Sequence, residues 1–245
     1  MCNFESISYL VNGLLYLALS IVFLSVNGTY SKEYVRLKRM FALCALMAMF
    51  VDAIRLGVVT WGYDCGLCDR FMVPVAYICQ AYLLTGSILY LMRSSKASFG
   101  SMAALSVPLL LVVILYVGCF GEFCSTNGFS MASYFFYTKM ELTKLFSIAL
   151  YVVMLVELPI CLYWLFTELH AFSRSGIQGT GIADVRSLSM SVFLFCVYFV
   201  FAIADLVIPS AEYAILFDWL SLMAFVSVGL AILRLRTDFV VRTIR

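Results

Sequence analysis

The feature that most constrains this chain is a series of seven long apolar stretches separated by short polar segments. They cover residues 7–27, 40–61, 71–92, 102–120, 143–166, 187–208 and 213–233. Each is close to the roughly 20 residues that an α-helix needs to cross a bilayer core of about 30 Å. The stretches are continuously apolar, which favours helices over the alternating strands of a membrane barrel. Because backbone groups in lipid must bond within their own segment, we expect an all-α, seven-transmembrane-helix bundle forming one domain over residues 1–245.

Composition excludes the other broad classes of protein. Apolar residues make up 64% of the chain and charged residues only 12%, against about 45–50% and about 25% in soluble domains. A net charge of +2 without a basic patch argues against nucleic acid as a partner, and 21 Phe with 15 Tyr argue against disorder. The chain is therefore expected to be an integral membrane protein of a bacterial inner membrane or a plasma membrane, with the lipid bilayer as its first partner.

The distribution of basic residues predicts how the chain is oriented. Twelve of the 16 Lys and Arg residues belong to segments expected on one side, which are Lys32, Arg36, Lys38, Arg39, Arg93, Lys96, Arg174, Arg186, Arg234, Arg236, Arg242 and Arg245. The opposite side carries only Arg70 and Lys139. The positive-inside rule then places the N-terminus outside and the C-terminus in the cytoplasm.

Polar residues inside the apolar stretches are costly in lipid and are therefore candidates for a functional site. The candidates for ligand binding are Asp52, Arg55, Gln80, Lys144, Glu157, Asp205 and Asp218. They lie in the middle or outer half of their stretches, so we expect a polar pocket open to the outside. The formal charge of the six ionisable groups is −2, which suits a small cation or a ligand that carries an amine.

A purely structural interpretation of the same residues stays open. Asp52 and Arg55 are three residues apart, so they share a helix face and are expected to pair. Asp205 and Asp218 lie near the ends of their stretches, where lipid headgroups and water would solvate them.

Five of the nine cysteines, Cys2 among them, fall at or near the expected outer face, where an oxidising compartment would allow disulfides. The disulfide candidates are the other four, Cys65, Cys68, Cys119 and Cys124. One or two bridges between them would tie the third apolar stretch to the fourth loop. Cys44, Cys79, Cys161 and Cys196 lie inside the stretches and are expected to act as small apolar side chains.

The segment Cys65-Gly66-Leu67-Cys68-Asp69-Arg70 resembles the quinone-linked thiol oxidases of the disulfide-forming membrane protein family. The resemblance implies that Cys65 and Cys68 are the catalytic pair, that Arg70 is their nearby cation, and that quinone is the cofactor. It also implies electron relay to a second pair, Cys119 and Cys124, by thiol–disulfide exchange.

Two further resemblances are architectural. Seven stretches with an outer N-terminus resemble the microbial rhodopsins, and Phe217-Asp218-Trp219 resembles part of their last helix. The position of the retinal-binding lysine holds Leu222, so the likeness is to a lysine-less relative without retinal. The chain also resembles bacterial seven-helix sensor modules, because a basic segment, Arg234-Leu235-Arg236-Thr237-Asp238, leaves the last stretch. That likeness implies a cytoplasmic signalling partner or a homo-oligomer.

The motif search favours binding over catalysis. The sequence has no Gly-x-Ser-x-Gly, Walker or His-Glu-x-x-His motif, and its single histidine, His170, predicts neither a haem nor a metal site. We therefore expect a receptor or sensor that binds a small polar or cationic ligand without a resident cofactor. The alternatives are a small-solute or ion transporter or channel, and a membrane thiol oxidoreductase that uses Cys65 and Cys68.

Overall fold

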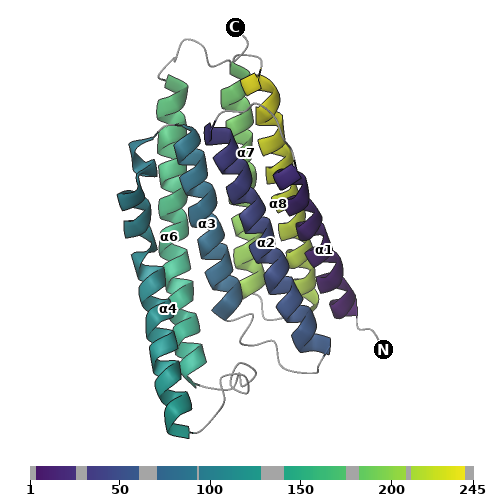
Figure 1. Cartoon of the computed structure of the whole chain (residues 1–245), viewed down its shortest axis with the longest axis vertical. Helices are drawn as coiled ribbons and strands as arrows, with labels where there is room; N and C mark the ends of the chain where they lie inside the picture. The colour runs from purple at the N-terminus through teal and green to yellow at the C-terminus, as the bar shows by residue number, and fades with distance from the viewer. Residues whose placement is uncertain are drawn as a thin grey trace.

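The computed structural model describes residues 4–25, 32–60, 71–92, 94–127, 141–174, 182–207 and 211–240, and all regular secondary structure in this part of the chain is helical. Its seven α-helices are α1 (Phe4–Ser25), α2 (Lys32–Thr60), α3 (Val73–Leu91), α4 (Phe99–Asn127), α6 (Glu141–Arg174), α7 (Ile182–Val207) and α8 (Ala211–Val240). A single 3-10 turn, η2 (Ser95–Ala97), connects α3 to α4. Successive helices run antiparallel, so that α1 begins and α8 ends at opposite ends of the bundle (Figure 1).

Six of the described helices form a closed ring, and α4 packs against its outside. Each of α1, α2 and α3 packs on the next, α3 packs on α6, and α6, α7 and α8 follow until α8 returns to α1. Helix α3 also touches α4 and α7, and 72% of its apolar span is buried. Helix α4 lies at the edge of the bundle (Figure 1), and only 22% of its span is buried. A cavity beside α3 therefore lies inside the bundle.

Length and composition qualify six of these helices to cross a membrane, and α7 contains a shorter apolar segment, Leu188–Phe201. Large apolar side chains such as Leu14, Ile114 and Val200 are about half exposed or more on the outer surface. Such a surface requires an apolar solvent. The expectation of an all-α membrane bundle is confirmed to this extent, whereas its orientation stays a prediction.

Several helices extend beyond the apolar stretches that announced them. Helix α2 begins at Lys32 rather than near residue 40, so Arg36 and Arg39 lie on a helix and not in a loop. Helices α6 and α8 likewise continue to Arg174 and Val240. The expected bounds were wrong here because hydropathy marks only the lipid-embedded part, whereas backbone hydrogen bonding continues into polar helix.

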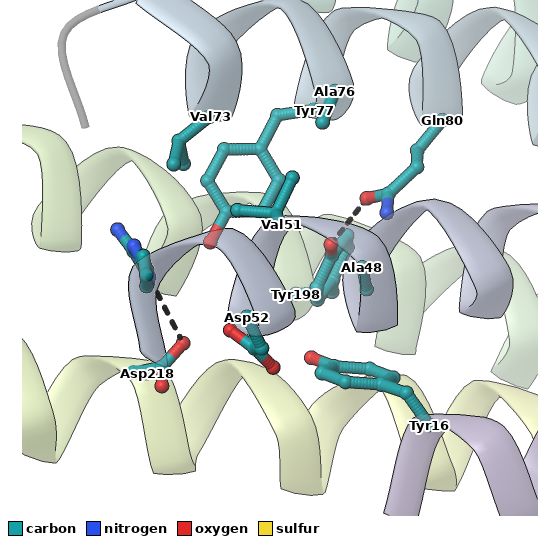
Figure 2. Close-up of a pocket in the computed structure, with 11 residues that line it drawn as sticks. Tyr16, Ala48, Val51, Asp52, Val73, Ala76, Tyr77, Gln80, Tyr198 and Asp218 are labelled. Carbon is teal, nitrogen blue, oxygen red and sulfur yellow. Dashed lines mark hydrogen bonds and ion pairs between the residues drawn. The ribbon is translucent and has the colours of Figure 1, made fainter. Parts of the chain in front are cut away.

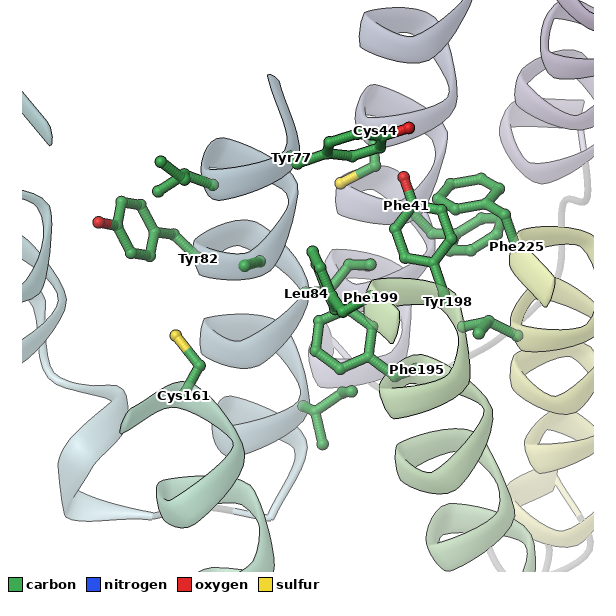
Figure 3. Close-up of a cluster of buried hydrophobic side chains, with 14 of the residues drawn as sticks. Phe41, Cys44, Tyr77, Tyr82, Leu84, Cys161, Phe195, Tyr198, Phe199 and Phe225 are labelled. Carbon is green, nitrogen blue, oxygen red and sulfur yellow. The ribbon is translucent and has the colours of Figure 1, made fainter. Parts of the chain in front are cut away.

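Aromatic rings fill the middle of the bundle between α1, α2, α7 and α8. The ring centroids of Phe23 and Phe41 are 4.5 Å apart, and Phe41 stacks on Phe225 at 4.5 Å. Figure 3 shows Phe41 and Phe225 together with Tyr198 of α7 in this apolar cluster. Gly229 of α8 leaves room for these stacked rings, because a Cβ at this position would lie only 2.9 Å from Phe41 Cζ.

Candidate functional site: a buried polar cavity

A small polar cavity lies between five helices (Figure 2). Asp52 lies in the last third of α2 and Asp218 in the first third of α8, so the cavity is nearer the end where α2 stops and α8 begins. It is lined by Tyr16 of α1; Ala48, Val51, Asp52 and Arg55 of α2; Val73, Ala76, Tyr77 and Gln80 of α3; Tyr198 of α7; and Asp218 of α8. Its volume is about 20 Å³, which is room for about one water molecule.

Asp218 joins three helices through one carboxylate. Asn12 Nδ2 of α1 donates a hydrogen bond to Asp218 Oδ2 at 2.6 Å, and an Arg55 guanidinium nitrogen lies 3.7 Å from Asp218 Oδ1. All three side chains are at least nine-tenths buried. Arg55 also lies over the ring of Tyr9, 5.5 Å from its centroid. Because the pairing takes place inside the bundle, water screens it little.

Asp52 faces the same cavity from α2 and is 3% exposed. Helix α1 comes close at this point, since a Cβ on Gly13 would lie 3.6 Å from the Cβ of Asp52. Figure 2 shows the carboxylates of Asp52 and Asp218 on one side of the cavity, with the Tyr16 hydroxyl beside Asp52. With Arg55 counted, the three ionised groups sum to a formal charge of −1.

Gln80 of α3 forms the opposite wall and links α3 to α2 and α7. The Tyr198 hydroxyl of α7 donates to Gln80 Oε1 at 2.5 Å, and Gln80 Nε2 donates to the backbone carbonyl of Cys44 on α2 at 3.0 Å. The rings of Tyr77 and Tyr198 meet edge to face at 5.9 Å. These contacts fix the direction of the Gln80 amide and make this wall rigid.

The structure brings together four of the residues that the sequence nominated. Asp52, Arg55, Gln80 and Asp218 line one cavity. Arg55 forms an ion pair with Asp218 on α8, and its expected pairing with Asp52 on the same helix stays a prediction.

The other nominated residues are not part of this cavity as described. Glu157 lies on the buried stripe of α6 that includes Met154 and Cys161, and neither of its carboxyl oxygens has a hydrogen-bond partner among the residues that the structure describes. It is 3% exposed and does not line the cavity. Lys144 and Asp205 belong to α6 and α7, and their side chains are outside the described part of the chain.

Sequence reasoning missed the neutral half of the site. Asn12, Tyr16, Tyr77 and Tyr198 carry no charge, and only ionisable groups and one amide were nominated. A signal did exist: Tyr9, Asn12 and Tyr16 recur at intervals of three and four residues, which places them on one face of a helix.

The structure describes some of the cysteines and not others. Cys65, Cys68 and Arg70 lie outside the described residues, so the thiol pair stays a prediction. Cys119 and Cys124 were expected around the start of a loop at residue 121, but α4 continues to Asn127 and carries both. The described thiols, Cys44, Cys79, Cys161 and Cys196, are free.

No protein-family model, curated protein or solved structure matches this chain. The function is therefore argued from the cavity and its chemistry.

Proposed function

We propose that this chain is a receptor- or sensor-type membrane bundle that binds its ligand through one small, positively charged group. The observation that supports this proposal is that two carboxylates, Asp52 and Asp218, line one buried cavity together with the guanidinium of Arg55, which lies 3.7 Å from Asp218. An excess negative charge is expensive to bury, and a ligand that supplies one positive charge would neutralise it. Oxygen acceptors from carboxylate and tyrosine side chains suit an N–H donor.

The size of the cavity favours a primary ammonium group as the charged group of the ligand. The free volume of about 20 Å³ is room for about one water molecule, and an ammonium group is of similar size. Quaternary ammonium carries four carbon substituents, so it would have to displace Tyr16 or Tyr77 or spread the helices apart. The site therefore favours a primary amine.

The position of the cavity suits a signalling role. It touches α1, α2, α3, α7 and α8, so a ligand that prefers one arrangement of these helices shifts the population toward it. Helices α2 and α8 run from the cavity to the opposite end of the bundle, where Arg36 and Arg234 lie. In the orientation that basic residues predict, the cavity is nearer the outside, and this opposite end faces a cytoplasmic partner or a second copy of the chain.

Binding is tested with the purified protein in lipid nanodiscs. Ethylamine hydrochloride should raise the melting temperature, whereas tetramethylammonium chloride and sodium chloride at equal ionic strength should not. Asp52→Asn and Asp218→Asn should each weaken ethylamine binding about tenfold or more, because each removes a charge that the ammonium faces.

Glu157→Gln is the matched control, since it also neutralises a carboxylate buried within the bundle, but one that lies outside the cavity. It should leave ethylamine binding unchanged. Equal shifts with ethylamine and tetramethylammonium, or a Glu157→Gln variant that binds as poorly as Asp52→Asn, would contradict the proposal.

A cation- or proton-coupled transporter is the second candidate, and one observation favours it. Glu157 is a third buried carboxylate, it lacks a hydrogen-bond partner among the described residues, and Pro159 interrupts α6 two positions later. Proline removes a backbone hydrogen bond and permits a kink. A transporter would move ethylamine into proteoliposomes, and Glu157→Gln would stop the uptake while ethylamine still binds.

A further inference from the structure

An apolar groove lies on the lipid-facing side of α2 and α3, next to the polar cavity. Its lining consists of Leu46, Met47, Phe50, Val51, Phe71, Met72, Val75 and Ala76. All eight side chains are apolar, and the groove has a volume of about 380 Å³. Phe50 is 57% exposed at its rim, so the groove opens toward lipid rather than into the core.

The groove and the polar cavity share part of their walls. Val51 and Ala76 line both of them, and each is 8% exposed. Asp52 follows Val51 directly on α2, and Tyr77 follows Ala76 directly on α3, and both point into the polar cavity (Figure 2). Two small side chains therefore separate an apolar space open to the bilayer from a site with a formal charge of −1.

We infer that the ligand is a single-chain membrane amphiphile with a primary ammonium head, which reaches the cavity sideways from the bilayer between α2 and α3. This inference rests on the proposed function and names its ligand class. The ammonium group lies between Asp52 and Asp218, and the chain passes Val51 and Ala76 into the groove. A space of about 380 Å³ accommodates a saturated chain of roughly a dozen carbons, since a methylene occupies about as much volume as a water molecule.

The ammonium head and the apolar chain of such a ligand contribute differently to binding. Lipid tails are as apolar as the groove, so moving the chain from the bilayer into the groove adds little affinity. The chain concentrates the ligand at the depth of the cavity, and the ammonium supplies the selectivity. The matching probe therefore has the same chain with a neutral head.

The test uses the full chain in nanodiscs and a dodecylamine that carries a photoactivatable diazirine in the middle of its chain. After illumination, mass spectrometry should locate the label on groove residues such as Met47, Phe50, Met72 and Val75. Excess dodecylamine should suppress this labelling, and excess dodecanol should not.

Two alanine substitutions of equal size form a matched pair. Ala76→Leu fills the shared wall and should lower groove labelling about tenfold or more, because added bulk in a packed wall is poorly accommodated. Ala53→Leu adds the same atoms at an exposed position of α2 outside the groove and should leave labelling unchanged. Asp218→Asn should reduce labelling as strongly as Ala76→Leu.

Labelling spread evenly over lipid-facing residues, for example Leu110 and Ile114 of α4, or labelling that dodecanol suppresses equally, would overturn the inference. If ethylamine still binds in an Asp218-dependent way under that outcome, the cavity is an amine site reached from water, and only the sideways route is wrong. If ethylamine fails to bind as well, the proposed function fails with it. Mapping on the unsubstituted chain decides the matter even if Ala76→Leu does not fold.

Discussion

At the scale of single residues, Asp218 shows how one carboxylate can hold a membrane bundle together. Lipid provides little hydrophobic drive between helices, so packing and interhelical polar contacts carry much of their association. Asp218 belongs to α8. It accepts a hydrogen bond from Asn12 of α1 and forms an ion pair with Arg55 of α2. These contacts tie α8 to α1 and α2, where α8 returns to α1 and closes the ring.

Asp218→Asn should therefore destabilise the protein. The substitution keeps the shape of the side chain but leaves the Arg55 guanidinium without its carboxylate partner on α8, and breaking a buried pair in this way costs about 2–5 kcal/mol. The double variant Asp218→Asn with Arg55→Leu should lose less than the sum of the two single losses, with a coupling of about 0.5–3 kcal/mol. Reversible unfolding in detergent measures all four free energies. Simple additivity would mean that the two side chains do not interact.

Glu157 should have the opposite effect on stability. Its carboxyl group is buried, and neither oxygen has a hydrogen-bond partner in the described part of the chain, so its desolvation is uncompensated. Glu157→Met replaces it with an apolar side chain of similar volume and should stabilise the protein by about 1–3 kcal/mol.

The same exchange at Glu168 is the control for Glu157. Glu168 lies 3.1 Å from the Lys96 ammonium, and its side chain is 23% exposed. Glu168→Met should therefore cost no more than about 1 kcal/mol, as is usual for solvated ion pairs. A destabilised Glu157→Met variant would show that the Glu157 carboxylate makes an interaction that stabilises the protein.

At the scale of helices, close packing of α8 against α1 and α2 depends on Gly229. A methyl group there would lie 2.9 Å from Phe41 Cζ and 3.3 Å from a ring carbon of Phe23, and both rings are fully buried. Gly229→Ala should cost about 1–3 kcal/mol, because overpacking forces the rings out of place.

Gly118 of α4 provides the matched helix position, because an added Cβ there meets nothing within 4 Å. Gly118→Ala should be neutral or should stabilise by up to about 1 kcal/mol, since alanine favours the helix. Thermal melts of both variants under identical conditions compare the two sites. A Gly229→Ala variant as stable as Gly118→Ala would mean that the aromatic stack yields easily.

Hydropathy was sufficient to predict the number and order of these helices, because only helices satisfy the backbone in lipid. It could not predict that α2 begins at Lys32 or that α4 continues to Asn127, since a helix continues beyond the membrane wherever its polar residues allow. It also says nothing about which helices are neighbours. The closure of the ring by α1 and α8 follows from packing alone.

The same limit explains which site residues the sequence could find. Depth along a helix is readable from sequence, and by that criterion Asp52 was grouped with Asp218, with which it shares a cavity in the structure. That the two residues bind a ligand stays a prediction. The rotation of a helix about its own axis, which decides the face that points into the cavity, cannot be predicted without knowing the neighbouring helices. Glu157 therefore passed the depth criterion, although its face of α6 does not reach the cavity.

At the scale of the whole molecule, the number of helices that cross the bilayer decides where the C-terminus lies. Six described helices meet the criteria for a membrane span, and α7 has an apolar segment of only 14 residues, Leu188–Phe201. Yet α7 is 26 residues long, or about 39 Å at 1.5 Å per residue, which is enough to cross the bilayer core. It packs closely on α8, and Figure 1 shows it running between the same two ends as its neighbours.

Seven crossings place the two termini on opposite sides, whereas six would place them on the same side. The basic residues at one end of α2, α6 and α8, such as Arg36, Arg174 and Arg234, predict a cytoplasmic C-terminus. In a bacterial host, a green fluorescent protein fused after Arg245 should fluoresce, and alkaline phosphatase fused there should be inactive. An epitope tag placed before Met1 should be cleaved by protease added to spheroplasts.

A tag protected at Met1 together with fluorescence at Arg245 would place both ends in the cytoplasm and leave α7 outside the set of crossing helices. An accessible tag at Met1 with active phosphatase at Arg245 would place both ends outside, and that result would contradict the seven-helix topology as well.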